Sequence, residues 1–162
     1  MEYDDLFIFD GVGWNFEPSE LSVTFGCVQM DKLRANLDRR QRNFELLAAH
    51  LAKRSDTFVL PRVTPGIETA WHMFPFLIQP ESKVPRGEFQ KHMESRGIDT
   101  RMIWSANVAR QPSFKDKPHR VAPGGLGNCD RVMESGLILS SSHGIDDEGI
   151  AYVCDTIDRF FG

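Results

Sequence analysis

Apolar residues recur at helical spacing in two consecutive stretches near the start of the chain. Ser19 is a good N-cap after a proline, and Leu21, Phe25 and Val28 then repeat every three or four positions. Asp31 is a second capping residue and precedes a longer run. The apolar face of that run is formed by Leu33, Leu37, Phe44, Leu47 and Leu51. The pattern predicts a bent or broken helical arm with one apolar side.

Three later stretches have the composition of strands. The clearest is 70–78, AWHMFPFLI, which is rich in aromatic and branched residues. Pro75 inside it has no N–H to donate, so we expect an edge or a bulge there. A second strand is predicted at 101–104 and a third, buried one at 137–139.

Helices are expected between and after these strands. Pro85 stands where a first helical turn begins, and Gly97 is a suitable C′ residue. Asn128 is the expected cap of a short helix, and Asp146 that of the last helix. The buried stripe of the last helix is predicted to be Ile150, Val153, Ile157 and Phe160.

This order of elements indicates an α/β fold, a short sheet covered by helices, with an N-terminal helical arm. We expect one structural unit in three parts: an irregular lead-in at 1–18, the helical arm at 19–54, and a small α/β domain at 55–162. Residues 105–127 form a long polar loop rich in proline and glycine, and loops of this length are commonly functional.

Composition narrows the possible functions. A formal net charge of −4 argues against nucleic acid or an anionic membrane as the main partner. The acidic start lacks the pattern of a signal peptide, and no apolar run approaches the roughly 20 residues of a membrane span. Cys27, Cys129 and Cys154 are expected to be reduced core thiols in a cytoplasmic protein. We expect no metal site, because neither the cysteines nor the histidines have ligand spacing.

Several segments, in order along most of the chain, resemble a known family. They include GVGWNFEPSELSVTFG (11–26), AWHMFPFLI (70–78), RGEFQKHMESRGIDTRMIW (86–104), NVARQPSF (107–114) and the final stretch from Asn128. Together they resemble the C-terminal part of the DegT/StrS-type sugar aminotransferases, fold-type I enzymes that use pyridoxal phosphate to modify nucleotide-linked keto sugars. The form Asn-x-x-Arg-Gln-Pro is most similar to the sugar 3-dehydratases of lipopolysaccharide O-antigen synthesis.

The resemblance implies roles for five residues. Asn15 corresponds to the asparagine that contacts the cofactor phosphate of the neighbouring subunit; the alternative is a residue that only stabilises a turn. Arg110 and Gln111 fall in the loop that faces the nucleotide sugar, where a guanidinium suits a diphosphate. Asn107 is assigned to the same substrate-side group. His143 matches a histidine of the closing turn, with a structural role as its alternative. No catalytic residue is assigned.

The family's cofactor lysine, a histidine in the 3-dehydratases, lies tens of residues before the position of Asn15. Residues 1–14 contain neither lysine nor histidine. We therefore expect the chain alone to be inactive and to bind no pyridoxal phosphate without an N-terminal cofactor domain.

The leading hypothesis is the C-terminal part of an enzyme that transaminates or 3-dehydrates nucleotide-linked 4-keto-6-deoxy sugars. Its partners would be a second copy in a homodimer, or a separately encoded N-terminal half. A second hypothesis is a non-catalytic interaction module that docks on such a cofactor domain, and a third is an unrelated α/β domain. The first two imply an exposed apolar face that includes 6–9 and part of the helical arm.

Overall fold

The computed structural model describes residues 13, 14 and 16–162, and the chain divides into two compact units, Met1–Arg34 and Ala35–Gly162. In the first unit the described residues lead into helix α1 (Glu20–Leu51). The backbone N–H of Ser22 donates to Ser19 Oγ at 3.3 Å, which confirms the predicted N-cap. The predicted patch at 6–9 lies outside the described residues.

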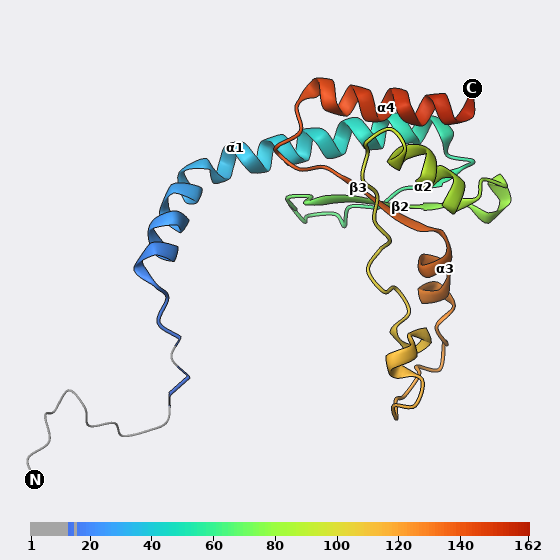
Figure 1. Ribbon diagram of the computed structural model, residues 1–162, viewed down its shortest axis with the longest axis horizontal. Helices are drawn as coiled ribbons and strands as arrows, with labels where there is room; N and C mark the ends of the chain where they lie inside the picture. Colours follow the sequence, from blue (N-terminus) through green and yellow to red (C-terminus); the bar gives the residue numbers. More distant parts are fainter. Residues whose placement is uncertain (1–12, 15) are drawn as a thin grey trace, which may run out of the picture. The chain divides into compact units, whose positions relative to one another are not determined.

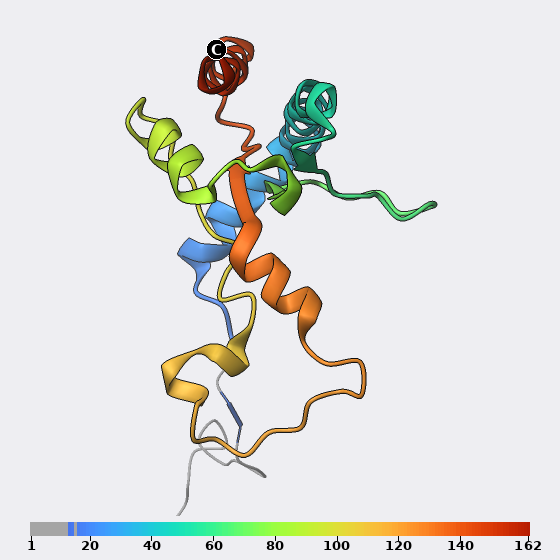
Figure 2. The same cartoon turned by 90° about the vertical axis from the view of Figure 1, so that its right-hand side faces the viewer.

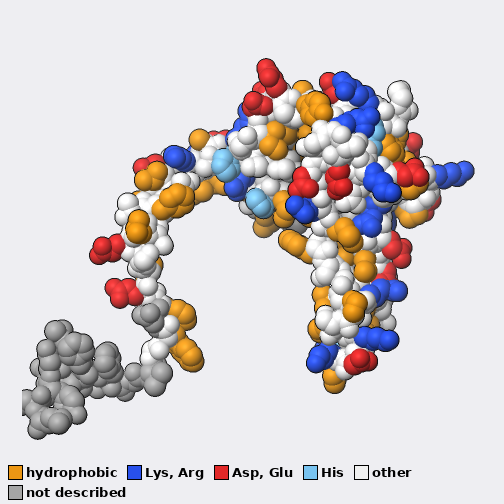
Figure 3. Space-filling model, in the orientation of Figure 1, with side chains coloured by type: hydrophobic (Ala, Val, Ile, Leu, Met, Phe, Trp, Pro, Cys, Tyr) orange, Lys and Arg blue, Asp and Glu red, His pale blue; other side chains and the backbone are white. Residues whose placement is uncertain are grey.

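Helix α1 does not restart at Asp31. It is assigned as one helix from Glu20 to Leu51, followed by the short 3₁₀ turn η2 (Ala52–Arg54). Its apolar residues within the first unit are exposed: Leu21, Val23, Phe25, Val28, Met30 and Leu33. Figure 3 shows hydrophobic side chains on the surface of this segment. The prediction that part of the helical arm exposes an apolar face is therefore confirmed.

The second unit contains a three-stranded antiparallel sheet in the order β1-β2-β3. The strands are β1 (Phe58–Val59), β2 (Met73–Ile78) and β3 (Gly136–Ser140). Two of the predicted strands thus exist, although β2 begins three residues later than expected. Strand β1 was not predicted, because a strand of two residues has no detectable periodicity in the sequence.

Pro75 occupies a local edge of the middle strand. It lies opposite Ile138, whose N–H and C=O both bond to Arg101 on the other side of β3. Pro75 and Ile138 are therefore a non-hydrogen-bonded pair, and the proline nitrogen faces the β1 side. The ladder with β1 pairs only Leu77 and Ile78 of β2, so the missing N–H removes no ladder bond.

The strand predicted at 101–104 is wrong beyond its first residue. Arg101 forms an isolated antiparallel bridge to Ile138, and the chain then turns. The N–H of Trp104 donates to the Met102 carbonyl at 2.8 Å, and Trp104 has φ +43°. A left-handed residue ends an extended strand, and nothing in the composition of MIW signals that turn.

One face of the sheet carries the core. Helices α2 (Arg86–Glu94) and α4 (Asp147–Phe161) and the part of α1 after residue 34 cover this face (Figures 1 and 2). Alternate residues of β2 point into it, as its burial pattern shows. The core comprises Phe44, Leu47, Leu51, Phe58, Phe74, Phe76, Ile78, Phe89, Met93, Ile98, Leu137, Leu139, Ile150, Val153 and Ile157. The predicted fold class, a short sheet covered by helices, is confirmed.

The helix ends test the remaining local predictions. The Gly149 N–H donates to Asp146 Oδ1 at 2.8 Å, so that N-cap is confirmed. Gly97 has φ +75°, as expected of a residue that closes a helix. Helix α3 (Gly127–Ser135) has Leu126 as its N-cap, so the predicted Asn128 cap is wrong.

The described helices are each too short or too polar to cross a membrane. Cys27 is exposed on α1, which corrects its expected place in a core, whereas Cys129 and Cys154 are half-buried. Burial, with Asp158 and Asp155 nearby, raises the pKa of the Cys154 thiol to about 11. Its thiolate is therefore disfavoured at neutral pH.

Candidate functional site

Asn107 is buried at the start of the long loop, with both ends of its amide engaged. Its Nδ2 donates to Asp130 Oδ1 of α3 at 2.5 Å, and its Oδ1 accepts from the N–H of Ala109 at 3.1 Å. The second bond caps the 3₁₀ turn η4 (Val108–Arg110). Asn107 therefore joins the loop to helix α3.

Arg110 is the exposed member of the same cluster. Its Nε and Nη2 donate to the two carboxylate oxygens of Asp130, and the Nη2 bond is 2.7 Å long. The bonds from Arg110 and Asn107 hold the pKa of the Asp130 carboxyl below its ordinary value. The arginine side chain remains 61% exposed, so its guanidinium is fixed in place while much of it stays open to solvent.

Asp130 was not singled out from the sequence. It lies in helix α3, twenty residues after Arg110, and no local pattern links the two. The structure brings together Asn107 and Arg110 through this carboxylate. Gln111 belongs to the same loop, and its Nε2 donates to the Ser105 carbonyl at 3.5 Å.

His143 lies elsewhere, in the turn between β3 and α4. It is exposed, and its Nδ1 accepts from Arg40 Nε at 3.3 Å. Because α3 precedes β3 and this turn follows it, the loop cluster and His143 lie at opposite ends of β3 (Figure 1). The predicted substrate-side residues therefore do not form a single cluster in this unit.

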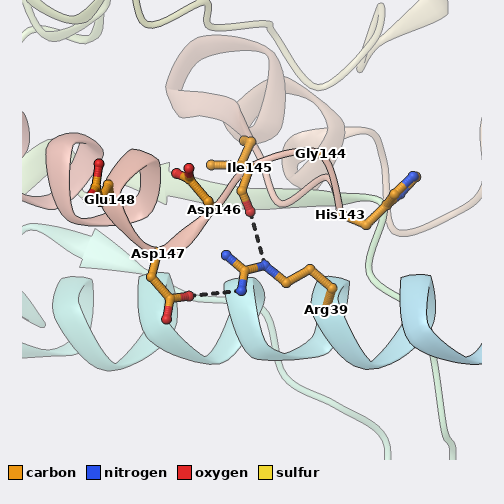
Figure 4. Close-up of a pocket in the computed structure, with 7 residues that line it drawn as sticks. All are labelled: Arg39, His143, Gly144, Ile145, Asp146, Asp147 and Glu148. Atoms are coloured by element: carbon orange, nitrogen blue, oxygen red, sulfur yellow. Dashed lines mark hydrogen bonds and ion pairs between the residues drawn. The ribbon is translucent and has the colours of Figure 1, made fainter.

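The turn around His143 borders an open cavity of about 450 Å³. Figure 4 shows Arg39 of α1 between the Ile145 carbonyl and the Asp147 carboxylate. Its Nε donates to that carbonyl at 3.0 Å, and its Nη1 lies 2.9 Å from Asp147 Oδ1. Arg42 adds a second pair to Asp147 at 2.8 Å. The residues at the start of α4 are thus bound to α1.

Asn43 is a second residue that the sequence did not point out. It is fully buried, and its Nδ2 donates to the carbonyls of Ser142 and Ile145 at 2.8 and 3.0 Å. The sequence signal that could have identified it is the position of this amide on the apolar face of α1, next to Phe44. A buried amide needs partners, and the turn supplies them for its Nδ2 group.

Comparison with known proteins identifies the family. Residues 1–158 match the DegT/DnrJ/EryC1/StrS aminotransferase family, and the chain belongs to it. Its relatives include enzymes of nucleotide-sugar and lipopolysaccharide synthesis, as the resemblance in the sequence had indicated.

Two relatives align with almost the whole chain. The lipopolysaccharide biosynthesis protein RfbH of Salmonella typhimurium is 28% identical over 160 residues, which are 99% of this chain and 36% of that protein. The dTDP-4-dehydro-2,6-dideoxy-D-glucose 3-dehydratase of Saccharopolyspora spinosa is 30% identical over 158 residues, 98% of this chain and 34% of that one. The chain thus spans about a third of the length of the curated relatives it matches.

A solved structure shows the same fold. The E. coli GDP-4-keto-6-deoxy-D-mannose-3-dehydratase with bound hydrated PLP superposes with a TM-score of 0.81 at 23% identity. The match covers 95% of this chain and 39% of that one.

The family uses pyridoxal phosphate, and the described residues offer few groups that could hold it. A site for pyridoxal phosphate needs donors for its phosphate and, where the cofactor is bound covalently, a lysine amine for its aldehyde. Lys53 borders a cavity between α1 and α4, but it is exposed. Arg42, which borders the same cavity about three helical turns away, is already paired with Asp147. This cavity therefore does not fit the cofactor. The expected phosphate contact, Asn15, lies outside the described residues. The described residues also contain no group of three acidic, histidine or cysteine side chains placed to hold a metal.

Proposed function

We propose that this chain forms the C-terminal part of a pyridoxal phosphate-dependent enzyme that acts on nucleotide-linked 4-keto-6-deoxy sugars in cell-surface polysaccharide synthesis. The observation that carries the proposal is the 30% identity to a nucleotide-sugar 3-dehydratase along 98% of the chain. Membership of the family supports the same reading. Of the two candidate reactions we favour 3-dehydration over transamination, because the relatives from Saccharopolyspora spinosa and E. coli O55:H7 are named as 3-dehydratases.

In this proposal the chain supplies substrate contacts and the cofactor domain supplies the chemistry. Arg110 contributes a guanidinium that is already oriented by Asp130, so little side-chain freedom is lost when it binds a diphosphate. Gln111 contributes an amide from the same loop. Asn107 positions this loop and does not contact the substrate, because both ends of its amide are hydrogen-bonded within the protein.

Asn15 and His143 are proposed to act at other points. Asn15 donates to the cofactor phosphate of the opposite subunit, and His143 contacts the substrate from the turn before α4. The exposed apolar part of α1 supports a partner that covers it. That partner is the N-terminal cofactor domain, in a homodimer or as a separately encoded half, and the assembled enzyme acts in the cytoplasm.

Reconstitution tests the function. The chain is co-purified with a cofactor domain, either its own upstream coding region or that of the Saccharopolyspora relative. Pyridoxal phosphate absorbance and turnover of dTDP- and GDP-linked 4-keto-6-deoxy sugars are then measured. Loss of the sugar 3-hydroxyl, detected by mass spectrometry, is the expected result. With glutamate present as amino donor, transfer of its amino group to the 4-keto carbon indicates an aminotransferase. No turnover with a fully loaded cofactor site and this donor present contradicts the proposal.

A further inference from the structure

Trp104 is held on the surface by a turn with unusual backbone angles. Its φ is +43° and that of Ala106 is +47°. Positive φ is uncommon for residues other than glycine, and least expected for a bulky one. Such conformations persist where surrounding contacts determine them, and they concentrate at functional sites.

Contacts on both sides fix this turn. Before it, Arg101 exchanges two backbone hydrogen bonds with Ile138 of β3, of 3.2 and 2.7 Å. After it, Asn107 is buried and bonded to Asp130. The turn itself is closed by a 3.2 Å bond from the Ala106 N–H to the Ile103 carbonyl. The result is an indole that is 77% exposed on a well-anchored backbone.

A cavity of about 350 Å³ lies against this indole. Trp104, Ile103 and Ala106 form one side, and Asn128, Cys129 and Val132 of α3 form the other. The lining is mostly apolar, and its polar members are Ser105 and Asn128. A hydroxyl and an amide can both donate and accept hydrogen bonds. This combination suits a flat aromatic ring with polar edges.

The anchor of Arg110 belongs to the helix that forms one side of this cavity, although Asp130 itself lines a different cavity, with Arg131 and Glu134. Asp130, which orients the Arg110 guanidinium, directly follows Asn128 and Cys129 in α3. An aromatic surface and a fixed cation are therefore placed on one loop and one helix end. A nucleoside diphosphate carries the matching pair of groups, a planar base and an anionic diphosphate.

We propose that Trp104 stacks on the base of the nucleotide-linked substrate while Arg110 binds its diphosphate. This inference rests on the proposed function, because the occupant is taken from the dTDP- and GDP-linked sugars named for the relatives. Stacking on an aromatic side chain tolerates different bases, since every base has a π-face. The site therefore accepts both guanine and thymine nucleotides.

Calorimetric titration of the 1–162 chain with GDP, dTDP and inorganic pyrophosphate tests the inference. Trp104→Ala is expected to weaken GDP and dTDP binding about tenfold, within the range for base–aromatic stacking, and to leave pyrophosphate binding unchanged. Trp104→Phe keeps most of the affinity. Arg110→Ala weakens all three ligands. Trp14→Ala is the matched control, because Trp14 is 80% exposed and lies outside the loop.

The outcomes separate this inference from the proposed function. Nucleotide affinity that is unchanged in Trp104→Ala overturns it, as does an equal loss for pyrophosphate, or no saturable nucleotide binding to the unmodified chain. If the reconstituted enzyme turns over nucleotide sugars and Trp104→Ala leaves KM unchanged, that result supports the proposed function and contradicts base stacking on Trp104. Trp104-dependent nucleotide binding without turnover keeps the base site and rejects the function.

Discussion

Asn43 donates a 2.8 Å hydrogen bond from Nδ2 to the backbone carbonyl of Ser142 and so joins helix α1 to the turn that precedes α4. The same amide group also bonds to the Ile145 carbonyl. These bonds, with Arg39 beside them, hold the turn that carries His143.

Replacement of Asn43 should destabilise the fold. Asn43→Ala removes two hydrogen bonds from a buried site, although the Ser142 carbonyl keeps the N–H of Ile145 and the Ile145 carbonyl keeps Arg39 Nε. We expect a loss of about 1–3 kcal/mol in the free energy of unfolding. Asn43→Asp has the same shape but offers acceptors to two carbonyls, so it should lose at least as much. Urea denaturation measures both, with Gln41→Ala, at a half-buried position of the same helix, as control. An Asn43→Asp variant as stable as the parent would contradict this reading.

Gly136 is required by a close approach at the junction of α3 and β3. A Cβ there would lie 2.5 Å from the Val132 carbonyl oxygen and 2.9 Å from Ile103 Cδ1. Gly136→Ala should therefore cost about 1–3 kcal/mol, as overpacking typically does. Gly124→Ala is the control, since a Cβ there meets nothing within 4 Å. Equal melting temperatures for the two variants would count against a tight junction.

Stability should fall in acid through Asp147. Hydrogen bonding to Arg42, helped by the charges of Arg42 and Arg39, keeps the pKa of this carboxyl below its ordinary value of 3.8. A lowered folded-state pKa stabilises the protein above the ordinary value, and that contribution disappears as pH falls through the folded-state pKa. Melting curves from pH 7 to pH 2 should show a shallower acid decline for Asp147→Asn than for the parent. Asp116→Asn, in the exposed loop, should decline as the parent does.

The exposed apolar part of α1 should drive self-association of the chain on its own. Leu21 and Phe25 are 85% and 68% exposed, one helical turn apart. Sedimentation velocity should show association that grows with protein concentration, and Leu21→Ser with Phe25→Ser should reduce it. Lys32→Ser, on the same helix, should have no effect. A parent chain that is monomeric at all concentrations and melts sharply would refute the prediction.

Asn15→Ala should weaken cofactor binding in the reconstituted enzyme. Loss of one hydrogen bond to a charged phosphate costs about 1.5–3 kcal/mol, which corresponds to a roughly ten- to hundred-fold lower affinity. Spectroscopic titration with pyridoxal phosphate measures the change. A lowered melting temperature of the apo-protein with unchanged cofactor affinity would instead make Asn15 a turn residue.

The fold was largely predictable because its signals are local. The periodic apolar residues of α4, the Asp146 cap and the alternating burial of β2 follow from short stretches of sequence. The strand expected at 101–104 failed because the turn at Trp104 is imposed by contacts on both sides of it. Gly136, which allows Ile103 to pack closely, lies more than thirty residues further along the chain.

The candidate site was predictable only in part for the same reason. Arg110 and Gln111 were found from a resemblance carried by their neighbours in the sequence. Asp130, which orients Arg110, and Asn43, which holds the His143 turn, depend on partners that are distant along the chain. Such pairs leave no periodic or spacing signal, so only the structure shows them.

The position of Pro75 has a consequence for how this sheet meets other chains. Among the described residues, the side of β2 that faces away from β3 is unpaired from Met73 to Phe76, past the last pair with β1. An open strand of this kind is a template for another strand, and repeated pairing of that sort leads to aggregates. Proline at the centre of the open stretch withholds the N–H that an incoming strand needs. The residue that looks like a defect in the middle strand therefore protects the sheet from extension.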